Sequence, residues 1–221
     1  MRLLITGASK GLGLVASNYF EAEGHTVHRW SSKQCNYLDF VSWDYKVPPI
    51  DAVIHCAGGG LGLKSPYLSA EALYQLFMVN LGGAVELNRF IAIRMREEGL
   101  KGRIIHVCSI ASGEAVGSVG YNTVKAALGA YVRSFGREMA PHGIVVSGIA
   151  PGGFYAPGNA MERLAANNPP AYQEFVDKRL PRGYMGGAEE LIPILKYLVS
   201  EDASMMGGCV VPIDAGEGHY Y

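Results

Sequence analysis

Two side chains with the potential for proton-transfer chemistry, Tyr121 and Lys125, lie four residues apart in the stretch GYNTVKAAL. Residues i and i+4 of an α-helix share a face, so a helix here would bring the lysine ammonium close to the tyrosine phenol. The positive charge would favour the phenolate, and such a tyrosine can give a proton to a carbonyl oxygen or take one from an alcohol. The spacing alone fits equally a tyrosine packed in the core beside a lysine that reaches water.

A glycine-rich loop, TGASKGLG, follows a predicted strand at Arg2–Thr6 and opens a predicted helix at 12–23. Small residues let the backbone approach a diphosphate, and a helix N-terminus supplies free N–H groups and partial positive charge. The spacing G-x-x-x-G-x-G differs from that of most dinucleotide sites, and a simple turn is the alternative. Its position between a strand and a helix predicts a dinucleotide site. The expected contacts are Gly7, Ser9, Lys10, Gly11, Leu12 and Gly13.

The end of the second predicted strand, Thr26–Trp30, indicates which dinucleotide is bound. NAD sites commonly place an acidic residue there for the ribose 2′-hydroxyl, but this chain has Ser31, Ser32 and Lys33. These hydroxyls can bind a 2′-phosphate, which Lys10 and Lys33 can neutralise. We therefore expect NADP(H) in preference to NAD(H); lysines that are merely solvated are the alternative.

Strands and helices alternate along the rest of the chain. The further strands are expected at 51–57, 103–108, 144–149 and 209–213, and the further helices at 70–98, 121–139 and 188–200. Several strands are continuous apolar runs, as a parallel sheet covered on both faces requires, and the alternation predicts right-handed β-α-β units. We expect an α/β fold: one doubly wound Rossmann domain over residues 1–221, with a mainly parallel sheet of seven strands, or of six because the region after the second strand is short.

Composition and charge narrow the classes of partner. The 221 residues are 49% hydrophobic and 18% charged, with a net charge of −1. We therefore expect neither a nucleic-acid surface nor a membrane segment. The four cysteines form no C-x-x-C pair and no cluster with metal-ligand spacing. Reduced thiols, no metal and a cytoplasmic location follow as expectations.

The loop, the tyrosine and the lysine, in this order, resemble the classical type of the short-chain dehydrogenase/reductase family, over nearly the whole chain. The positions that are similar to the family's motifs are residues 6–13 for T-G-x-x-x-G-x-G, Ala57 and Gly58 for the second half of N-N-A-G, Asn80 for the helix asparagine, Ser109 for the catalytic serine, Tyr121 and Lys125 for Y-x-x-x-K, and Pro151 and Gly152 for the Pro-Gly turn.

The chain departs from the family pattern in its shorter segments. About twenty residues separate the second predicted strand from 51–57, where the family usually has a further helix and strand. Asp39 in this stretch resembles the aspartate that meets the adenine ring. The segment from Ser109 to Tyr121 is one residue shorter than the commonest spacing. The threonine that often follows the Pro-Gly turn is absent, which leaves the nicotinamide carboxamide to backbone groups near Phe154.

The resemblance implies an oxidoreductase that transfers hydride between a nicotinamide cofactor and a ketone or secondary alcohol. It implies that Tyr121 is the general acid and base, that Lys125 tunes it and binds the nicotinamide ribose, and that Ser109 holds the substrate oxygen. Asn80 would anchor a water that links Lys125 to solvent; Ser112 is a rival to Ser109. The remaining expected cofactor contacts are Ala57, Gly58, Gly59, Pro151, Gly152 and Phe154. The alternative is a non-catalytic dinucleotide-binding sensor, which has no need for these residues in catalytic order.

Residues 153–185 lie where the family covers its substrate, and we expect a substrate lid there; a structural helical hairpin is the alternative. Its charged residues Arg163, Lys178, Arg179 and Arg182 either meet an anionic substrate group or are solvated. The substrate itself stays open beyond a small carbonyl compound or alcohol. Apolar residues on more than one face of the helices at 70–98 and 121–139 suit pairing between subunits, so we expect a homodimer or homotetramer.

Overall fold

Among the residues that the structure describes, 1–39, 43 and 46–219 of a computed structural model, six strands form one sheet with the order β2-β1-β3-β4-β5-β8. Neighbouring strands are parallel throughout. The strands are β1 (Arg2–Thr6), β2 (Thr26–Trp30), β3 (Ala52–His55), β4 (Arg103–Val107), β5 (Val145–Pro151) and β8 (Val210–Ile213). The strand order reverses direction between β1 and β3, which is where open α/β sheets bind ligands.

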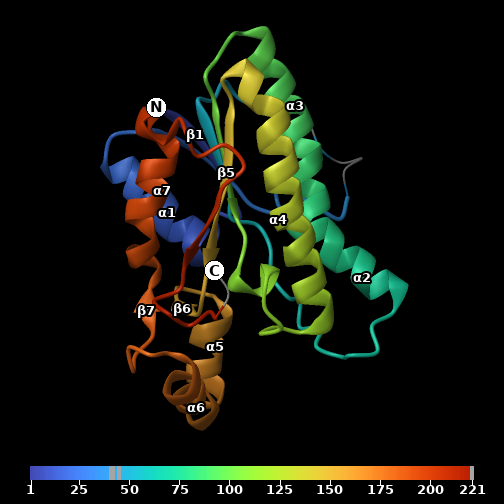
Figure 1. Cartoon of the computed structure of the whole chain (residues 1–221), viewed down its shortest axis with the longest axis vertical. Helices are drawn as coiled ribbons and strands as arrows, with labels where there is room; N and C mark the ends of the chain where they lie inside the picture. The colour runs from blue at the N-terminus through green and yellow to red at the C-terminus, as the bar shows by residue number, and fades with distance from the viewer. Residues whose placement is uncertain (40–42, 44–45, 220–221) are drawn as a thin grey trace.

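Helices cover both faces of the sheet (Figure 1). One face carries α1 (Gly11–Ala22) and α7 (Ile192–Val199), and the other carries α3 (Gly83–Glu97) and α4 (Val119–Met139). Leu3 and Ile5 of β1 belong to the buried cluster with α1 and α7, whereas Leu4 between them belongs to the cluster with α3. Successive side chains of a strand point to opposite faces. Because both faces are buried, the central strands β1, β3, β4 and β5 are apolar at most positions instead of alternating.

The predicted helix at 70–98 forms, but its winding changes in the middle. α2 (Ala70–Phe77) runs into a π-helical turn, η2 (Met78–Gly82), and α3 follows. Ser69 caps α2, its Oγ accepting the Ala72 N–H at 3.2 Å. The run Ala70–Glu97 is long and apolar enough to cross a membrane by length and composition alone, but more than half of its most apolar window is buried within the protein, as in a core helix.

The stretch between β2 and β3 has neither helix nor strand in its described residues, 31–39, 43 and 46–51. The sheet therefore has the smaller of the two expected strand numbers. Tyr37 and Trp43 from this stretch are buried against each other, with ring centroids 5.6 Å apart, in the cluster on the α3 side. The Tyr37 ring occupies the space that a Cβ on Gly83 would need. The Tyr37 ring thus covers the start of α3, and Trp43 packs against that ring.

The chain between β5 and α7 forms two helices beyond the carboxyl end of the sheet, α5 (Ala160–Asn167) and α6 (Pro169–Arg179) (Figure 1). The short strands β6 (Phe154–Tyr155) and β7 (Gly186–Gly187) pair with each other and so join the two ends of this excursion. The remaining short helical turns are η3 (Ile110–Ser112), η4 (Ala140–His142), η5 (Ala188–Leu191) and η6 (Glu201–Ala203).

Candidate active site

The loop between β1 and α1 leaves no space for side chains at two of its glycines. A Cβ on Gly7 would lie 2.7 Å from the backbone N of Ala57, and one on Gly13 would lie 2.5 Å from the carbonyl O of Gly7. Gly7 also has a φ of +66°, which favours glycine. The loop, the first turn of α1 and the end of β3 therefore meet backbone to backbone. This cradle fits a dinucleotide, because it leaves the N-terminal N–H groups of α1 at the ligand-binding edge of the sheet.

The start of α1 also meets the segment after β6. Lys10 is the N-cap of α1 and is exposed together with Ser9, whereas Leu12 is buried. The Gly11 N–H donates to the carbonyl O of Pro157 at 2.6 Å. The expected lid thus lies against the expected diphosphate site.

The turn after β2 presents hydroxyl and ammonium groups beside the glycine loop, since the Ala8 N–H donates to Trp30 O at 3.1 Å. The Ser31 Oγ donates to Gln34 Oε1 at 2.8 Å, and Ser32 and Lys33 are exposed. Asp39 lies further along in an exposed turn, where its N–H donates to Asn36 O.

Asn80 holds the glycines that follow β3. Its Oδ1 accepts the Gly59 N–H and its Nδ2 donates to Gly59 O, both at 2.9 Å, and Nδ2 also donates to Leu76 O. A Cβ on Gly58 would lie 2.9 Å from Asn80 Oδ1 and 3.5 Å from Lys125 Nζ. Asn80 is 2% exposed and lies in the π-helical turn, a feature frequent at functional sites. Its side chain therefore fixes the backbone beside Lys125.

Tyr121 and Lys125 lie on the same side of α4. The Nζ of Lys125 is 5.7 Å from the centre of the Tyr121 ring and donates to Val107 O, at the end of β4, at 2.9 Å. Lys125 is only 4% exposed, whereas Tyr121 is partly exposed. The alternative of a core tyrosine beside a lysine in water is therefore wrong, because the lysine is the more buried of the two.

The two candidate serines lie at opposite ends of η3. Ser109 is its N-cap, is partly exposed, and accepts the Ala111 N–H at its Oγ at 3.1 Å. Ser112 lies against Gly129 of α4, and its buried Oγ has no hydrogen-bond partner among the described residues. Ser109 is thus the serine that faces outward at the carboxyl end of β4.

A buried polar network lies under this edge of the sheet. The rings of His55 and His106 stack with centroids 4.6 Å apart. Asn88 joins them: its Oδ1 lies 2.8 Å from His55 Nε2 and its Nδ2 lies 3.1 Å from His106 Nε2, so His55 donates and His106 accepts. Burial lowers the pKa of His55 to about 4, and burial, with the charges of His55 and Lys125, holds the pKa of His106 well below its usual range. Both rings are therefore neutral at neutral pH.

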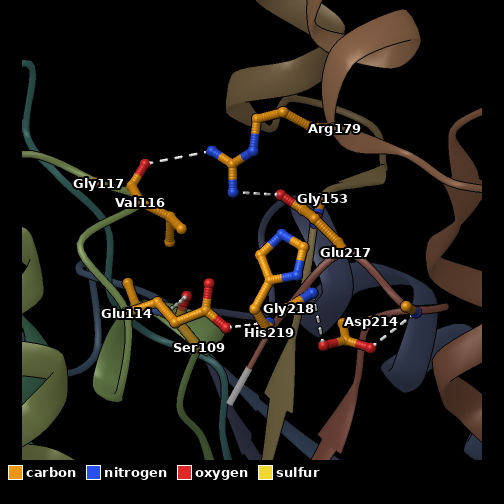
Figure 2. A network of polar contacts seen from close by, with 12 residues as sticks. Ser109, Glu114, Val116, Gly117, Gly153, Arg179, Asp214, Glu217, Gly218 and His219 are labelled. Atoms are coloured by element: carbon orange, nitrogen blue, oxygen red, sulfur yellow. Dashed lines mark hydrogen bonds and ion pairs between the residues drawn. The ribbon is translucent and has the colours of Figure 1, made fainter.

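The turn after β5 is held from the far end of the chain. The Gly152 N–H donates to Ile213 O at 3.2 Å, and the Gly153 N–H donates to Glu217 Oε2. Figure 2 shows Glu217 between Gly153 and Arg179 of α6. Phe154 O accepts from Asn159 Nδ2 at 2.7 Å.

Sequence reasoning missed Asn88 and Glu217, which carry no motif. Their roles depend on partners far away in the sequence: the Gly153–Glu217 bond spans 64 residues. The motif residues, in contrast, gather as expected at the carboxyl ends of β1, β3, β4 and β5.

Comparison with known proteins agrees with this arrangement. A family model described as enoyl-(acyl carrier protein) reductase matches residues 40–217. The 3-oxoacyl-[acyl-carrier-protein] reductase MabA of Mycobacterium avium is 27% identical over 234 residues, which cover 98% of this chain and 89% of that protein.

Two solved structures show the same fold. A 3-oxoacyl (acyl-carrier-protein) reductase from Agrobacterium tumefaciens C58 with NADP bound has a TM-score of 0.82 at 21% identity, covering 99% of this chain and 93% of that one. A 4-hydroxyisoleucine dehydrogenase complexed with NADH has a TM-score of 0.84 at 22% identity, covering 98% of each chain. The chain belongs to the short-chain dehydrogenase/reductase family, whose members act on CH–OH and C=O groups with NAD(P).

Proposed function

We propose that this protein is an NADP(H)-dependent oxidoreductase that interconverts a ketone and a secondary alcohol, with Tyr121 as the general acid and base. The observation that carries the proposal is the burial of the Lys125 ammonium beside the Tyr121 ring. Burying an ammonium costs free energy, and a core would pack more favourably around an apolar side chain. The charge is therefore better explained by chemistry than by stability.

In the direction of reduction, the Tyr121 phenol gives its proton to the carbonyl oxygen of the substrate, and the bound cofactor supplies the hydride to the carbonyl carbon. The Lys125 ammonium stabilises the phenolate that remains. The Ser109 Oγ accepts a hydrogen bond from Ala111 N, which leaves its own hydrogen available for the same substrate oxygen. Positioned proton transfer of this kind contributes about 10²–10⁴-fold to the rate. Oxidation uses the same groups in reverse.

Asn80 positions the backbone beside Lys125. Its three hydrogen bonds go to backbone groups, and Gly58 lies close to both Asn80 Oδ1 and Lys125 Nζ. After each reduction the Tyr121 phenolate takes up a proton by way of Lys125, and a water on the solvent side of Gly58 and Gly59 replaces the proton that Lys125 gives up.

Residues along the carboxyl edge of the sheet would hold the cofactor. The glycine loop would take its diphosphate, with Gly7 and Gly13 giving the close approach and the N–H groups of residues 9, 10 and 12 available for hydrogen bonds, since that of Gly11 donates to Pro157 O. Residues 57–59, 151–152 and the backbone of Phe154 would hold its nicotinamide. Ser31 and Ser32 would bind the 2′-phosphate of NADP(H), with Lys33 and Lys10 neutralising it, and Asp39 would contact the adenine. Family neighbours with NADP and with NADH support either dinucleotide, and the absence of an acid among residues 31–34 favours NADP(H).

We further propose that the whole chain works as one domain whose residues 153–185 cover the substrate. The two solved structures named above act on different compounds by their names, so the fold does not determine the substrate. The segment that contains α5 and α6 lies directly beyond the carboxyl edge of the sheet, where the proposed catalytic residues gather. This position supports its role as the part of the protein that selects the substrate.

Apolar side chains exposed on α2 and α3 support a homodimer or homotetramer. Leu73, Tyr74 and Phe77 of α2 and Val85 and Ile93 of α3 are all more than a third exposed. Helices that share such a face bury it by pairing across a two-fold axis. The four free cysteines support a cytoplasmic location.

The test is oxidation of NADPH or NADH by the purified protein, followed by absorbance, against a panel of aliphatic, cyclic and 3-oxoacyl ketones. We expect turnover of at least one ketone, with a higher kcat/KM for NADPH than for NADH. Tight NADPH binding without turnover of any carbonyl compound would contradict the proposal and favour a non-catalytic sensor.

A further inference from the structure

A buried carboxylate outside the family's motifs reaches the turn that follows β5. Glu217 lies in the segment after β8, and its side chain is 2% exposed. Its Oε2 accepts the Gly153 N–H, and its Oε1 pairs with Arg179 Nη2 at 2.7 Å. The two oxygens therefore join a backbone turn on one side to a helix of the expected lid on the other (Figure 2).

Arg179 connects the lid to two other segments at once. It lies in the last turn of α6, where its other amino group donates to Val116 O at 3.3 Å. Val116 belongs to the loop between Ser109 and Tyr121. The guanidinium carbon lies 5.1 Å from the ring centre of Phe175, on the same helix. One side chain thus holds α6, the loop before the catalytic tyrosine and the C-terminal segment together.

The turn accepts these side chains because its residues are glycines. A Cβ on Gly152 would lie 2.5 Å from Glu217 Oε2, and one on Gly153 would lie 3.0 Å from the Phe175 ring. The carboxylate and the aromatic ring fill the space that side chains at these two positions would take. The turn is therefore shaped by Glu217 and by α6 together.

The charges around Glu217 make its ionised, buried state dependent on Arg179. Burial raises the pKa of Glu217, and the carboxylates of Asp214 and Glu114 act in the same direction, while the Gly153 N–H and the Arg179 charge oppose them. Asp214 accepts the N–H groups of Gly216 and Gly218, and Glu114 accepts that of His219. Without Arg179, Glu217 would be a buried charge with acidic neighbours, which is strongly unfavourable.

We propose that Glu217 is a positioning residue for the turn at residues 151–154 and that Arg179 controls it, so that docking of α6 and fixing of this turn are one event. The inference rests on the proposed function only in taking this turn to contact the cofactor. With α6 docked, Glu217 stays ionised and holds the Gly153 N–H. With α6 undocked, Glu217 is a buried charge without its partner and turns to water, and the turn loses its anchor.

The experiment compares Arg179→Met, Glu217→Gln and the double variant. The first readout is hydrogen exchange of the Gly153 amide in the cofactor-free protein, and the second is the Kd for NADPH. For Arg179→Met at pH 8 we expect exchange at Gly153 and the Kd to rise about tenfold or more, because the uncompensated charge moves. Relative to the wild type at the same pH, both should recover as the pH is lowered and Glu217 gains a proton.

The double variant gives the sharpest result. It has no buried charge at this site, so its exchange rate at Gly153 and its Kd for NADPH should lie within about threefold of those of Glu217→Gln alone. Both values should be lower than those of Arg179→Met. If Arg179→Met does not fold, Arg179→Lys retains the charge without the two-pronged geometry. We then expect a smaller loss of protection at Gly153, and no loss at all would overturn the proposal.

Lys178 and Glu174 provide the matched control, since they form an exposed ion pair at 2.6 Å on the same helix. Lys178→Met, with or without Glu174→Gln, should leave exchange at Gly153 unchanged. Wild-type exchange in Arg179→Met at every pH, or a double variant worse than both single ones, would overturn the inference. Because exchange is measured without cofactor, these outcomes are distinct from a failure to oxidise NADPH, which would contradict only the proposed function.

Discussion

The side chain of Asn80 and the backbone of Gly59 bond to each other in both directions, Oδ1 accepting the N–H and Nδ2 donating to the carbonyl O, each at 2.9 Å. This pairing joins the middle of a long helix to the end of β3. It does so in the turn where the helix takes up π winding, and it anchors the glycine segment that passes beside Lys125.

Replacing Asn80 by alanine should therefore lower stability and cofactor affinity together. The change leaves the partly buried Gly59 N–H and C=O without their partner, and an unpaired group costs up to about 1–3 kcal/mol when water cannot replace the bond. We expect the free energy of unfolding, measured by urea titration, to fall by about 2–4 kcal/mol. Asn36→Ala, in an exposed turn, is the control; equal losses in the two variants would contradict this role of Asn80.

Tyr121→Phe removes the proposed acid and keeps the ring. We expect kcat for ketone reduction to fall by at least about 10²-fold, while the Kd for NADPH, measured by fluorescence titration, changes by less than about twofold. Tyr67→Phe removes the hydroxyl of a fully solvated tyrosine and should have wild-type kinetics. Turnover at the wild-type rate in Tyr121→Phe would refute the assignment.

Lys125→Met separates catalysis from stability. Methionine keeps most of the side-chain volume and removes a buried charge, a change that is often neutral or stabilising. We therefore expect a melting temperature equal to or above that of the wild type, together with a loss of kcat of about 10²-fold or more. A variant that melts earlier and keeps its kcat would show that Lys125 serves the fold instead.

Ser31→Asp tests the dinucleotide preference. A carboxylate at this position would repel a 2′-phosphate and could accept a ribose 2′-hydroxyl. We expect kcat/KM for NADPH to fall by about tenfold or more and that for NADH to hold or rise. Ser204→Asp adds the same charge at an exposed site after α7 and should change neither value. An unchanged ratio in Ser31→Asp would place the phosphate elsewhere.

The buried histidines predict a loss of stability in acid. The pKa of His55 is about 4 in the folded protein and about 6.5 in the unfolded chain, so the unfolded state binds more protons between these values. The free energy of unfolding should therefore decrease as the pH falls from about 6.5 toward 4, by about 3 kcal/mol for this residue. His55→Asn should flatten that slope in urea titrations across pH, whereas His142→Asn, at an exposed position, should leave it intact. Identical slopes in all three proteins would contradict the prediction.

The positions of many strands and helices follow from residue patterns within each segment. β1 and β2 form at the residues predicted, and the helix that carries Tyr121 starts two residues earlier, at Val119. The long apolar helix starts at the predicted residue and ends one residue earlier than predicted, at Glu97. Its π-helical turn was not predicted, because the change of winding depends on the contact of Asn80 with the loop after β3. The described part of the stretch after β2 contains no further helix. Its residue pattern did not predict that Tyr37 and Trp43 would pack on the α3 side of the sheet instead.

What the sequence determined by itself is the order of the strands and helices, the glycine loop and the four-residue spacing of Tyr121 and Lys125, because these depend on neighbours within one or two turns of chain. The tertiary structure decided that Lys125 is buried, that Asn88 joins two stacked histidines and that Glu217 reaches Gly153 and Arg179. Each of these is a hydrogen bond or charge pair between segments far apart in the chain. Such pairs form only after the sheet has brought the strand ends together, so no local spacing encodes them.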